Sequence, residues 1–300
     1  MNDECGLQNA SAGATNVRLI IQHFWLITHH VLVACELARA HSAAGAALAV
    51  WVGARLAGAH WAPGWLLPMA VAFLLSAAGN ADNDAHDAAL DRLNRPQRPI
   101  PRGAATPAAA HSLALGAASL ALLVALRFGP ASTLGALVAI AASAFYTRGL
   151  KQYPLLGNAV VGALAGMAVG YGGLLAGRVT AVILPGSTLV AFFTGRELLK
   201  TLYDLPGDRA FGVRTAATTW GPPGTLRLVS ALWGASAGLL AAWSGLVVGG
   251  GALALLASLL FPLWRRPAER SVAGRVLAWS KALGLLALLG LLALGQSVSP

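Results

Sequence analysis

Seven of the eleven acidic residues in this apolar chain fall in two short stretches of sequence. They are, in chain order, Asp82, Asp84, Asp87, Asp91, Glu197, Asp204 and Asp208. On a helix, the i, i+3, i+7 spacing of Asp84, Asp87 and Asp91 places the three carboxylates on one face. Asp204 and Asp208 share a face for the same reason. Carboxylates this close repel one another and need a counter-ion, and hard oxygen ligands of this kind suit Mg²⁺. The amide oxygen of Asn83 is a further candidate ligand.

Basic residues follow the first acidic stretch directly, in a segment stiffened by prolines. The segment "RLNRPQRPIPRG" contains Arg92, Arg95, Arg98 and Arg102. The guanidinium group suits bidentate contact with phosphate. Carboxylates for Mg²⁺ beside Arg and Lys for phosphate predict a diphosphate site. At the mouth of a helix bundle, such a site suits an amphiphile with an apolar tail, and a prenyl diphosphate is such a molecule.

The composition indicates a membrane protein. Hydrophobic residues make up 57% of the 300 residues and charged residues 11%, which is too little charge to cover a water-facing surface of this size. The formal net charge of +10 would suggest nucleic acid for a soluble protein, but basic loops between membrane helices explain it better. No basic stretch carries the interleaved aromatic residues of a single-strand binder, so nucleic acid is not an expected partner.

The apolar segments predict an all-α, multi-pass bundle of about nine transmembrane helices with a central cavity. The expected spans are 42–59, 64–83, 105–127, 131–147, 155–177, 180–202, 224–245, 248–264 and 274–296. The loops after every second span carry most of the Arg and Lys residues, which the positive-inside rule assigns to the cytoplasm. Both acidic stretches lie on this side. We therefore expect an inner or plasma membrane protein whose cavity opens to the cytoplasm.

The chain divides into an N-terminal extension, 1–36, and a transmembrane domain, 37–300. Residues 16–36 are apolar but carry Arg18, His23, His29 and His30. This pattern fits a helix lying at the membrane interface or an additional span, and the interfacial helix is favoured.

The motifs resemble those of the UbiA prenyltransferase superfamily over about residues 37–296. "NDAHDAALDRLNRPQRPIPRG" resembles its first aspartate-rich motif, and "DLPGDRAFGVRTAATTWG" looks like its second. "YTRGLKQYPLLGN" is similar to the family's Y-x-x-x-L-K loop. "RAHS" from Arg39 is similar to the opening R-P-x-N motif, but Ala40 replaces Pro and Ser42 replaces Asn.

The resemblance implies a Mg²⁺-dependent enzyme that ionises a polyprenyl diphosphate and transfers the prenyl group to an aromatic ring, a quinone precursor or another small acceptor. It implies metal ligands at Asn83, Asp84, Asp87, Asp91, Asp204 and Asp208. It implies substrate-binding roles for Arg39, Ser42, Asn83, Arg95, Arg98, Arg102, Arg148 and Lys151. The expected catalytic residues are the five aspartates together with Tyr146, which would face the reacting carbon, and Lys151. The donor (geranylgeranyl diphosphate is one candidate), the acceptor and the oligomeric state are left open.

The second motif also departs from the family pattern. It is nearest to the branch that prenylates geranylgeranylglycerol phosphate, but Thr201, Tyr203 and Pro206 stand where three acids are expected. A UbiA-type terpene cyclase, which uses no acceptor, is therefore the alternative. A transporter is a remote alternative, because the chain shows no clear internal repeat. An intramembrane aspartyl protease is equally remote, because it needs two aspartates that share a proton, and this chain has more than two clustered acids.

Overall fold

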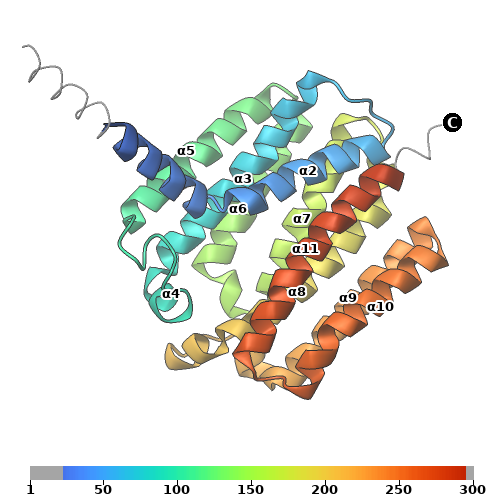
Figure 1. The fold of residues 1–300 in the computed structure, drawn as a ribbon. Helices are drawn as coiled ribbons and strands as arrows, with labels where there is room; N and C mark the ends of the chain where they lie inside the picture. Colours follow the sequence, from blue (N-terminus) through green and yellow to red (C-terminus); the bar gives the residue numbers. More distant parts are fainter. Residues whose placement is uncertain (1–22, 295–300) are drawn as a thin grey trace, which may run out of the picture.

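The computed structural model describes residues 23–294, and within that range every regular element is a helix (Figure 1). A first helix, His23–Leu37, precedes α2. The numbered α-helices are α2 (Ala40–Leu56), α3 (Leu66–His86), α4 (Ala88–Asn94), α5 (Pro107–Leu126), α6 (Pro130–Arg148), α7 (Leu156–Leu175), α8 (Ile183–Ala210), α9 (Ala216–Ser244), α10 (Leu246–Arg265) and α11 (Arg270–Leu294). Short 3₁₀ turns are η1 (Pro63–Trp65), η2 (Leu150–Gln152) and η3 (Val179–Val182). The predicted all-α, multi-pass architecture is confirmed.

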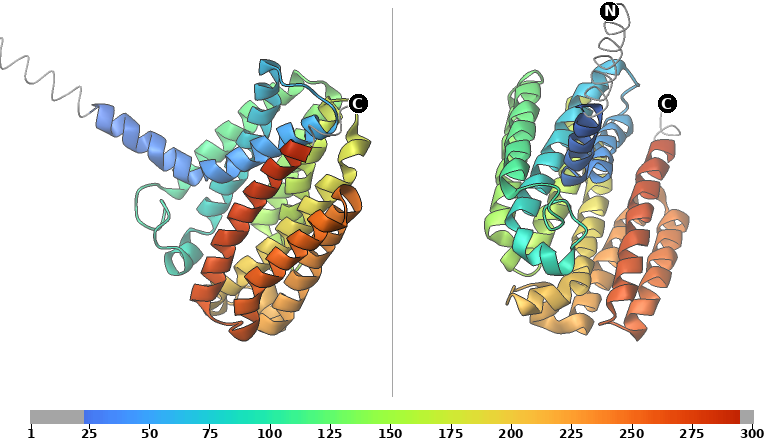
Figure 2. Two further views of the ribbon diagram at one scale, coloured as in Figure 1. Left: turned by 45° about the vertical axis from the view of Figure 1, so that its right-hand side comes forward. Right: turned by 60° about the vertical axis from the view of Figure 1, so that its left-hand side comes forward.

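Eight helices in the described part of the chain are long and apolar enough to cross a membrane. The expected span at 42–59 corresponds to α2, whose 17 residues are too few to count alone. It qualifies only together with the helix His23–Leu37, from which it is bent by 60°, and this pair raises the total to nine. Figure 2 shows the bend between the two helices.

The helix before α2 packs against the bundle at its C-terminal end. Val33 and Leu37 lie in one buried cluster with Ala81 and Ala85 of α3 and Ala110 of α5. The expected extension 1–36 therefore falls partly on this helix, and its residues 1–22 lie outside the described range. Whether the helix lies at the membrane interface stays a prediction.

Glycines allow the helices around α7 to approach closely. A Cβ on Gly172 of α7 would lie 1.9 Å from the backbone oxygen of Val50 in α2. Conversely, a Cβ on Gly53 of α2 would lie 1.9 Å from the oxygen of Val169. Small residues at such crossings let backbones meet where lipid offers no hydrophobic driving force between helices. The contact fixes α2 against α7.

The C-terminal half of the bundle is centred on α8. Its residues Leu198, Leu199 and Leu202 pack in one buried cluster with Trp233 of α9 and Leu260 of α10. The indole N–H of Trp233 donates to the backbone oxygen of Phe192 at 3.1 Å. The C-terminal end of α8 also contacts α4, so the two acidic stretches meet at one end of the bundle (Figures 1 and 2).

Candidate active site

The first acidic stretch bends at Asp87. The helix α3 ends at His86 and α4 begins at Ala88, with Asp87 at the junction. The helix on which the spacing argument relied is therefore interrupted at one residue. The aspartates still converge, because the side chains of Asp84 and Asp91 both bind the guanidinium group of Arg98.

Cations from three other segments neutralise this first stretch. Asp84 is paired with Arg39, which lies directly before α2, and with Arg98, whose Nη1 atom is 3.1 Å away. Asp87 is paired with Lys151 of η2 and accepts a hydrogen bond from the side-chain nitrogen of Asn83 at 2.9 Å. Two of these cations, Arg39 and Lys151, are more than 40 residues away from their carboxylate partners in sequence, one on either side.

The second acidic stretch lies on a helix that does not break. The helix α8 continues through Pro206 to Ala210, eight residues beyond the expected end of the span at 202. Nη2 of Arg95 donates to both carboxylate oxygens of Asp204, each at 2.7 Å. Asp208 is buried and has no ion pair within the described part of the chain. A cation from the segment that follows the first stretch thus binds the second.

A close backbone contact adds to this link. The backbone N–H of Gly207 in α8 donates to Oδ1 of Asn94 at the end of α4, at 3.2 Å. A Cβ on Gly207 would lie 2.2 Å from that oxygen, so any other residue there would force the side chain of Asn94 to move. The guanidinium group of Arg270 holds the same turn by donating to the backbone oxygen of Asn94 at 2.6 Å.

Both acidic stretches line one cavity of about 490 Å³. Its acidic lining residues are Asp87, Asp91, Glu197, Asp204 and Asp208. Its basic lining residues are Arg95, Arg98, Lys151, Lys200 and Arg214, together with His86. Asn83 and Tyr146 also line it. Carboxylates and cations therefore share a single polar chamber at the end of an apolar bundle.

The chamber has the properties of a cation site. Oδ1 of Asn83 is a buried acceptor without a hydrogen-bond partner. Burial raises the pKa of Asp91, an effect that Arg98 opposes and the neighbouring carboxylates Asp87 and Asp84 strengthen. A divalent cation would satisfy the free acceptor and favour the charged form of Asp91. The hard oxygen donors in this set fit Mg²⁺.

The electrostatic balance at Arg95 also favours a charged site. Burial acts to lower the pKa of Arg95, but Asp204, with help from Asp91 and Glu197, outweighs burial and raises it. Arg95 is therefore firmly cationic where the two stretches meet. A fixed guanidinium group at this position is suited to an incoming phosphate.

Three of the expected substrate-binding residues lie away from the chamber. Arg102 is paired with Glu36 at 2.7 Å, outside the cavity lining. Arg148 is exposed, with its Nη1 atom 3.6 Å from Oδ2 of Asp82. Ser42 is exposed on α2. Arg39 is also absent from the cavity lining, as is Asp84, the expected metal ligand with which Arg39 is paired.

Sequence reasoning missed several residues of the chamber. Lys200 lines the cavity, with Nζ 3.1 Å from Oε2 of Glu197. Asn158 and Thr215 also line it, and although the quoted motifs contain both residues, neither was assigned a role. The i, i+3 spacing of Glu197 and Lys200 on the helix leading to Asp204 was the available signal. For Asn158 and Thr215 the signal was their position within the motif sequences "YTRGLKQYPLLGN" and "DLPGDRAFGVRTAATTWG".

The structure is thus a helical membrane bundle with a chamber lined by carboxylates and cations, a lining that suits the charged headgroup of an apolar molecule. Residues 44–282 match the model of the UbiA prenyltransferase family. The chain belongs to this family and is a prenyltransferase.

Similar proteins include two digeranylgeranylglyceryl phosphate synthases. The protein from Sulfolobus acidocaldarius is 31% identical over 192 residues, which cover 63% of this chain and 70% of that protein. The protein from Methanopyrus kandleri is 37% identical over 203 residues, covering 65% and 72%.

Solved structures share the fold. A UbiA homologue from Aeropyrum pernix K1 superimposes with a TM-score of 0.68 at 22% identity, over 86% of this chain and 98% of that one. A UbiA homologue from Archaeoglobus fulgidus, bound to GPP and Mg²⁺, gives a TM-score of 0.64 at 16% identity, over 87% and 99%. These likenesses establish the architecture around the chamber.

Proposed function

We propose that this prenyltransferase uses Mg²⁺ to ionise a prenyl diphosphate and transfers the prenyl group to a small acceptor. The observation that carries the proposal is the single chamber in which both aspartate stretches meet Arg95, Arg98 and Lys151. The complex of GPP and Mg²⁺ in the Archaeoglobus fulgidus homologue supports the choice of ligands. Geranylgeranyl diphosphate is the proposed donor, since the similar synthases are named for a digeranylgeranyl product.

The residues have distinct proposed roles. Asn83, Asp84, Asp87 and Asp91 would hold Mg²⁺ on one side of the diphosphate, and Asp204 and Asp208 would hold it on the other. When bound, Mg²⁺ supplies charge that stabilises the leaving diphosphate. Arg95, Arg98 and Lys151 donate hydrogen bonds to the same group, and these donors favour the departing charge over the ground state.

Tyr146 and the apolar part of the bundle would stabilise the prenyl cation and protect it from water. Tyr146 lines the chamber beside the carboxylates, and the face of an aromatic ring attracts a cation. The surrounding membrane helices exclude water that would otherwise quench the cation. The protein is proposed to lie in the inner or plasma membrane with the chamber opening toward the cytoplasm. The basic loops are expected on the cytoplasmic side, and the chamber lies at the same end of the bundle as these loops.

The proposed acceptor is a glyceryl phosphate lipid, as the names of the similar synthases suggest. Cyclisation without an acceptor is the second candidate. Thr201 lines the chamber where the family branch is expected to carry an acid, so the acceptor side differs from that pattern. Aromatic and quinone-precursor acceptors are the remaining transferase options.

The test uses purified protein, geranylgeranyl diphosphate and Mg²⁺, with and without geranylgeranylglyceryl phosphate. We expect little diphosphate release without acceptor and a digeranylgeranyl product with it. A cyclic hydrocarbon or alcohol formed without acceptor would show that the reaction is cyclisation and not transfer. If Mg²⁺ and a panel of phenols and glyceryl phosphates gave no diphosphate release, the proposed function would be wrong.

A further inference from the structure

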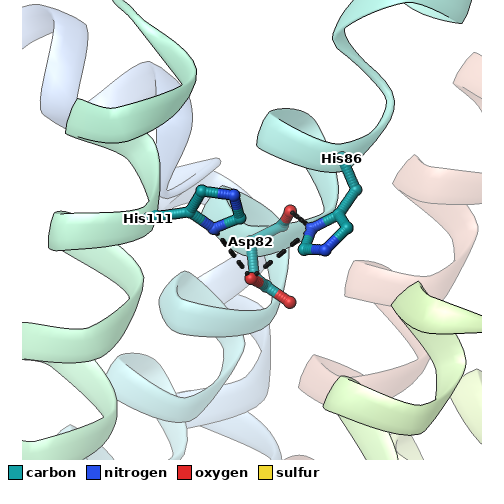
Figure 3. A group of neighbouring side chains, drawn as sticks. All are labelled: Asp82, His86 and His111. Carbon is teal, nitrogen blue, oxygen red and sulfur yellow. Dashed lines mark hydrogen bonds and ion pairs between the residues drawn. The ribbon is translucent and has the colours of Figure 1, made fainter.

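A second group of metal-ligating side chains lies at the rim of the chamber. Asp82 and His86 are on the last turns of α3, and His111 is on α5 (Figure 3). Figure 3 shows the Asp82 carboxylate between the two imidazole rings. One ligating atom from each side chain lies within 4.8 Å of the other two. None of the three residues is a proposed Mg²⁺ ligand, although His86 lies within the first aspartate-rich motif.

The distances within the group match those of a compact metal site. Nδ1 of His111 lies 3.1 Å from Oδ1 of Asp82, and Nδ1 of His86 lies 3.6 Å from the same oxygen. Ligands about 2.0–2.1 Å from a tetrahedral metal ion are about 3.3 Å apart. For an ion to be bound by all three side chains, the His86–Asp82 separation has to shorten slightly, and the ligating atoms of the two histidines, which lie within 4.8 Å of each other, have to approach to about 3.3 Å.

The ligand types select the class of metal. Two imidazoles and one carboxylate suit divalent transition metals such as Zn²⁺, whereas Mg²⁺ prefers oxygen ligands and retains its water. The side chains of His86 and His111 are partly exposed, at 30% and 46%, so an ion can reach them from solvent. We propose that Asp82, His86 and His111 form a binding site for a divalent transition metal, with water as the fourth ligand.

Two existing contacts would change when the ion binds. Nδ1 of His86 lies 2.8 Å from the backbone oxygen of Asp82, and this hydrogen bond is exchanged for a bond to the metal. The guanidinium group of Arg148, 3.6 Å from Oδ2 of Asp82, competes with the ion for the carboxylate. An occupied site joins α3 to α5 one residue before Asp87, and holds His86, which lines the chamber, against α5.

The first experiment titrates Co²⁺ into the purified full-length protein, without a histidine tag, and records the visible d–d absorption. We expect a signal in the wild type that Zn²⁺ abolishes and Mg²⁺ leaves in place. His111→Ala should weaken Co²⁺ binding at least about tenfold, the scale seen even for outer-shell partners. The matched control His60→Ala changes an exposed histidine outside this group and should bind as the wild type does.

Further variants separate this site from the Mg²⁺ chamber. Asp87→Ala should retain the Co²⁺ signal. Loss of the signal in Asp87→Ala, or displacement of Co²⁺ by Mg²⁺ in the wild type, would mean that Co²⁺ binds the chamber carboxylates. Either result would overturn the proposal. An absent signal in the wild type, or an unchanged one in His111→Ala, would also overturn it. The proposal does not depend on prenyl transfer, so its failure would leave the proposed function intact.

Two measurements guard against a misfolded variant. Without metal, the melting temperature of His111→Ala should lie within a few degrees of that of the wild type. Zn²⁺ should raise the melting temperature of the wild type but not that of His111→Ala. Arg148→Gln removes the competing cation and should tighten Co²⁺ binding several-fold. Unchanged or weaker binding in Arg148→Gln would mean that Asp82 is not a ligand, and would overturn the three-ligand site.

Discussion

The two acidic stretches have the same chemistry but are built in different ways. The first lies where the chain breaks between α3 and α4, and its carboxylates are neutralised by Arg39, Arg98 and Lys151 from three other segments. The second lies on the unbroken α8, where Glu197 is paired with Arg196 and Lys200 of the same helix. Among the described residues, the only ion pair that joins this stretch to another segment is between Asp204 and Arg95. The first stretch is therefore assembled from several parts of the chain, whereas the second is a rigid platform.

This difference shows how one chamber is made from distant sequence. Arg95 belongs to the segment after the first stretch but binds Asp204 of the second, and Asn94 beside it binds Gly207. The segment α4 is thus fastened to α8 by an ion pair and a backbone hydrogen bond. The relative position of the two carboxylate groups depends on this fastening.

The largest expected effect comes from removing one carboxylate of either stretch. Asp87→Ala and Asp204→Ala should each reduce Mg²⁺-dependent prenyl transfer at least about 100-fold, because each removes charge stabilisation at the leaving diphosphate. Diphosphate release in detergent is the measurement. Glu269→Ala, which changes an acid in the loop before α11, is the matched control and should keep near wild-type rates. Near wild-type turnover in either aspartate variant would contradict one shared site.

A smaller effect is expected from Arg98→Ala. This side chain binds both Asp84 and Asp91 and lines the chamber, so its loss should raise KM for the prenyl diphosphate about tenfold, with a lesser change in kcat. Initial rates at varied donor concentration give both constants. Arg98→Lys keeps the positive charge but loses the bidentate guanidinium geometry, so its KM should lie between those of the wild type and Arg98→Ala. An unchanged KM in Arg98→Ala would count against diphosphate binding by this residue.

The fastening of α4 to α8 is tested by Gly207→Ala. The added Cβ overlaps the side chain of Asn94, and overpacking of this kind costs about 1–3 kcal/mol. We expect prenyl transfer to fall about fivefold, measured by diphosphate release. The double variant Asn94→Ala with Gly207→Ala relieves the overlap and should recover part of the loss. If Gly207→Ala alone were as active as the wild type, the close contact would not position the site.

The smallest expected effect is at Arg102, which the sequence placed in the substrate site. Its pair with Glu36 is exposed, and such pairs contribute about 0–1 kcal/mol. Arg102→Ala should therefore change KM for the donor less than about twofold and leave the melting temperature nearly unchanged. A tenfold rise in KM would show that Arg102 reaches the diphosphate after all and would restore the assignment made from the motif.

Much of the fold was predictable because membrane spans leave a strong signal in composition. The expected spans 105–127 and 131–147 match α5 and α6 within two residues. The ends of α3 and α8 were less predictable. Periodicity cannot reveal the bend at Asp87, and Pro206 suggests a stop that neighbouring helices make unnecessary.

The site was predictable to the level of residue types and less so in its pairing. The motifs identified the aspartates and Arg95 and Arg98, all of which the structure brings to or beside one chamber. Spacing along the chain could not show that Arg95 binds Asp204, since that pair joins residues 109 positions apart. Nor could it show that Arg102 and Arg148 turn away to other carboxylates.

The central claim is that both acidic stretches form one diphosphate site, and donor binding tests it most directly. Isothermal titration of geranylgeranyl diphosphate into the purified protein with Mg²⁺ should give one donor per chain. Asp87→Ala and Asp204→Ala should each weaken that binding strongly, and removal of Mg²⁺ should do the same in the wild type. Wild-type affinity in either variant would show that the two stretches do not serve the same ligand.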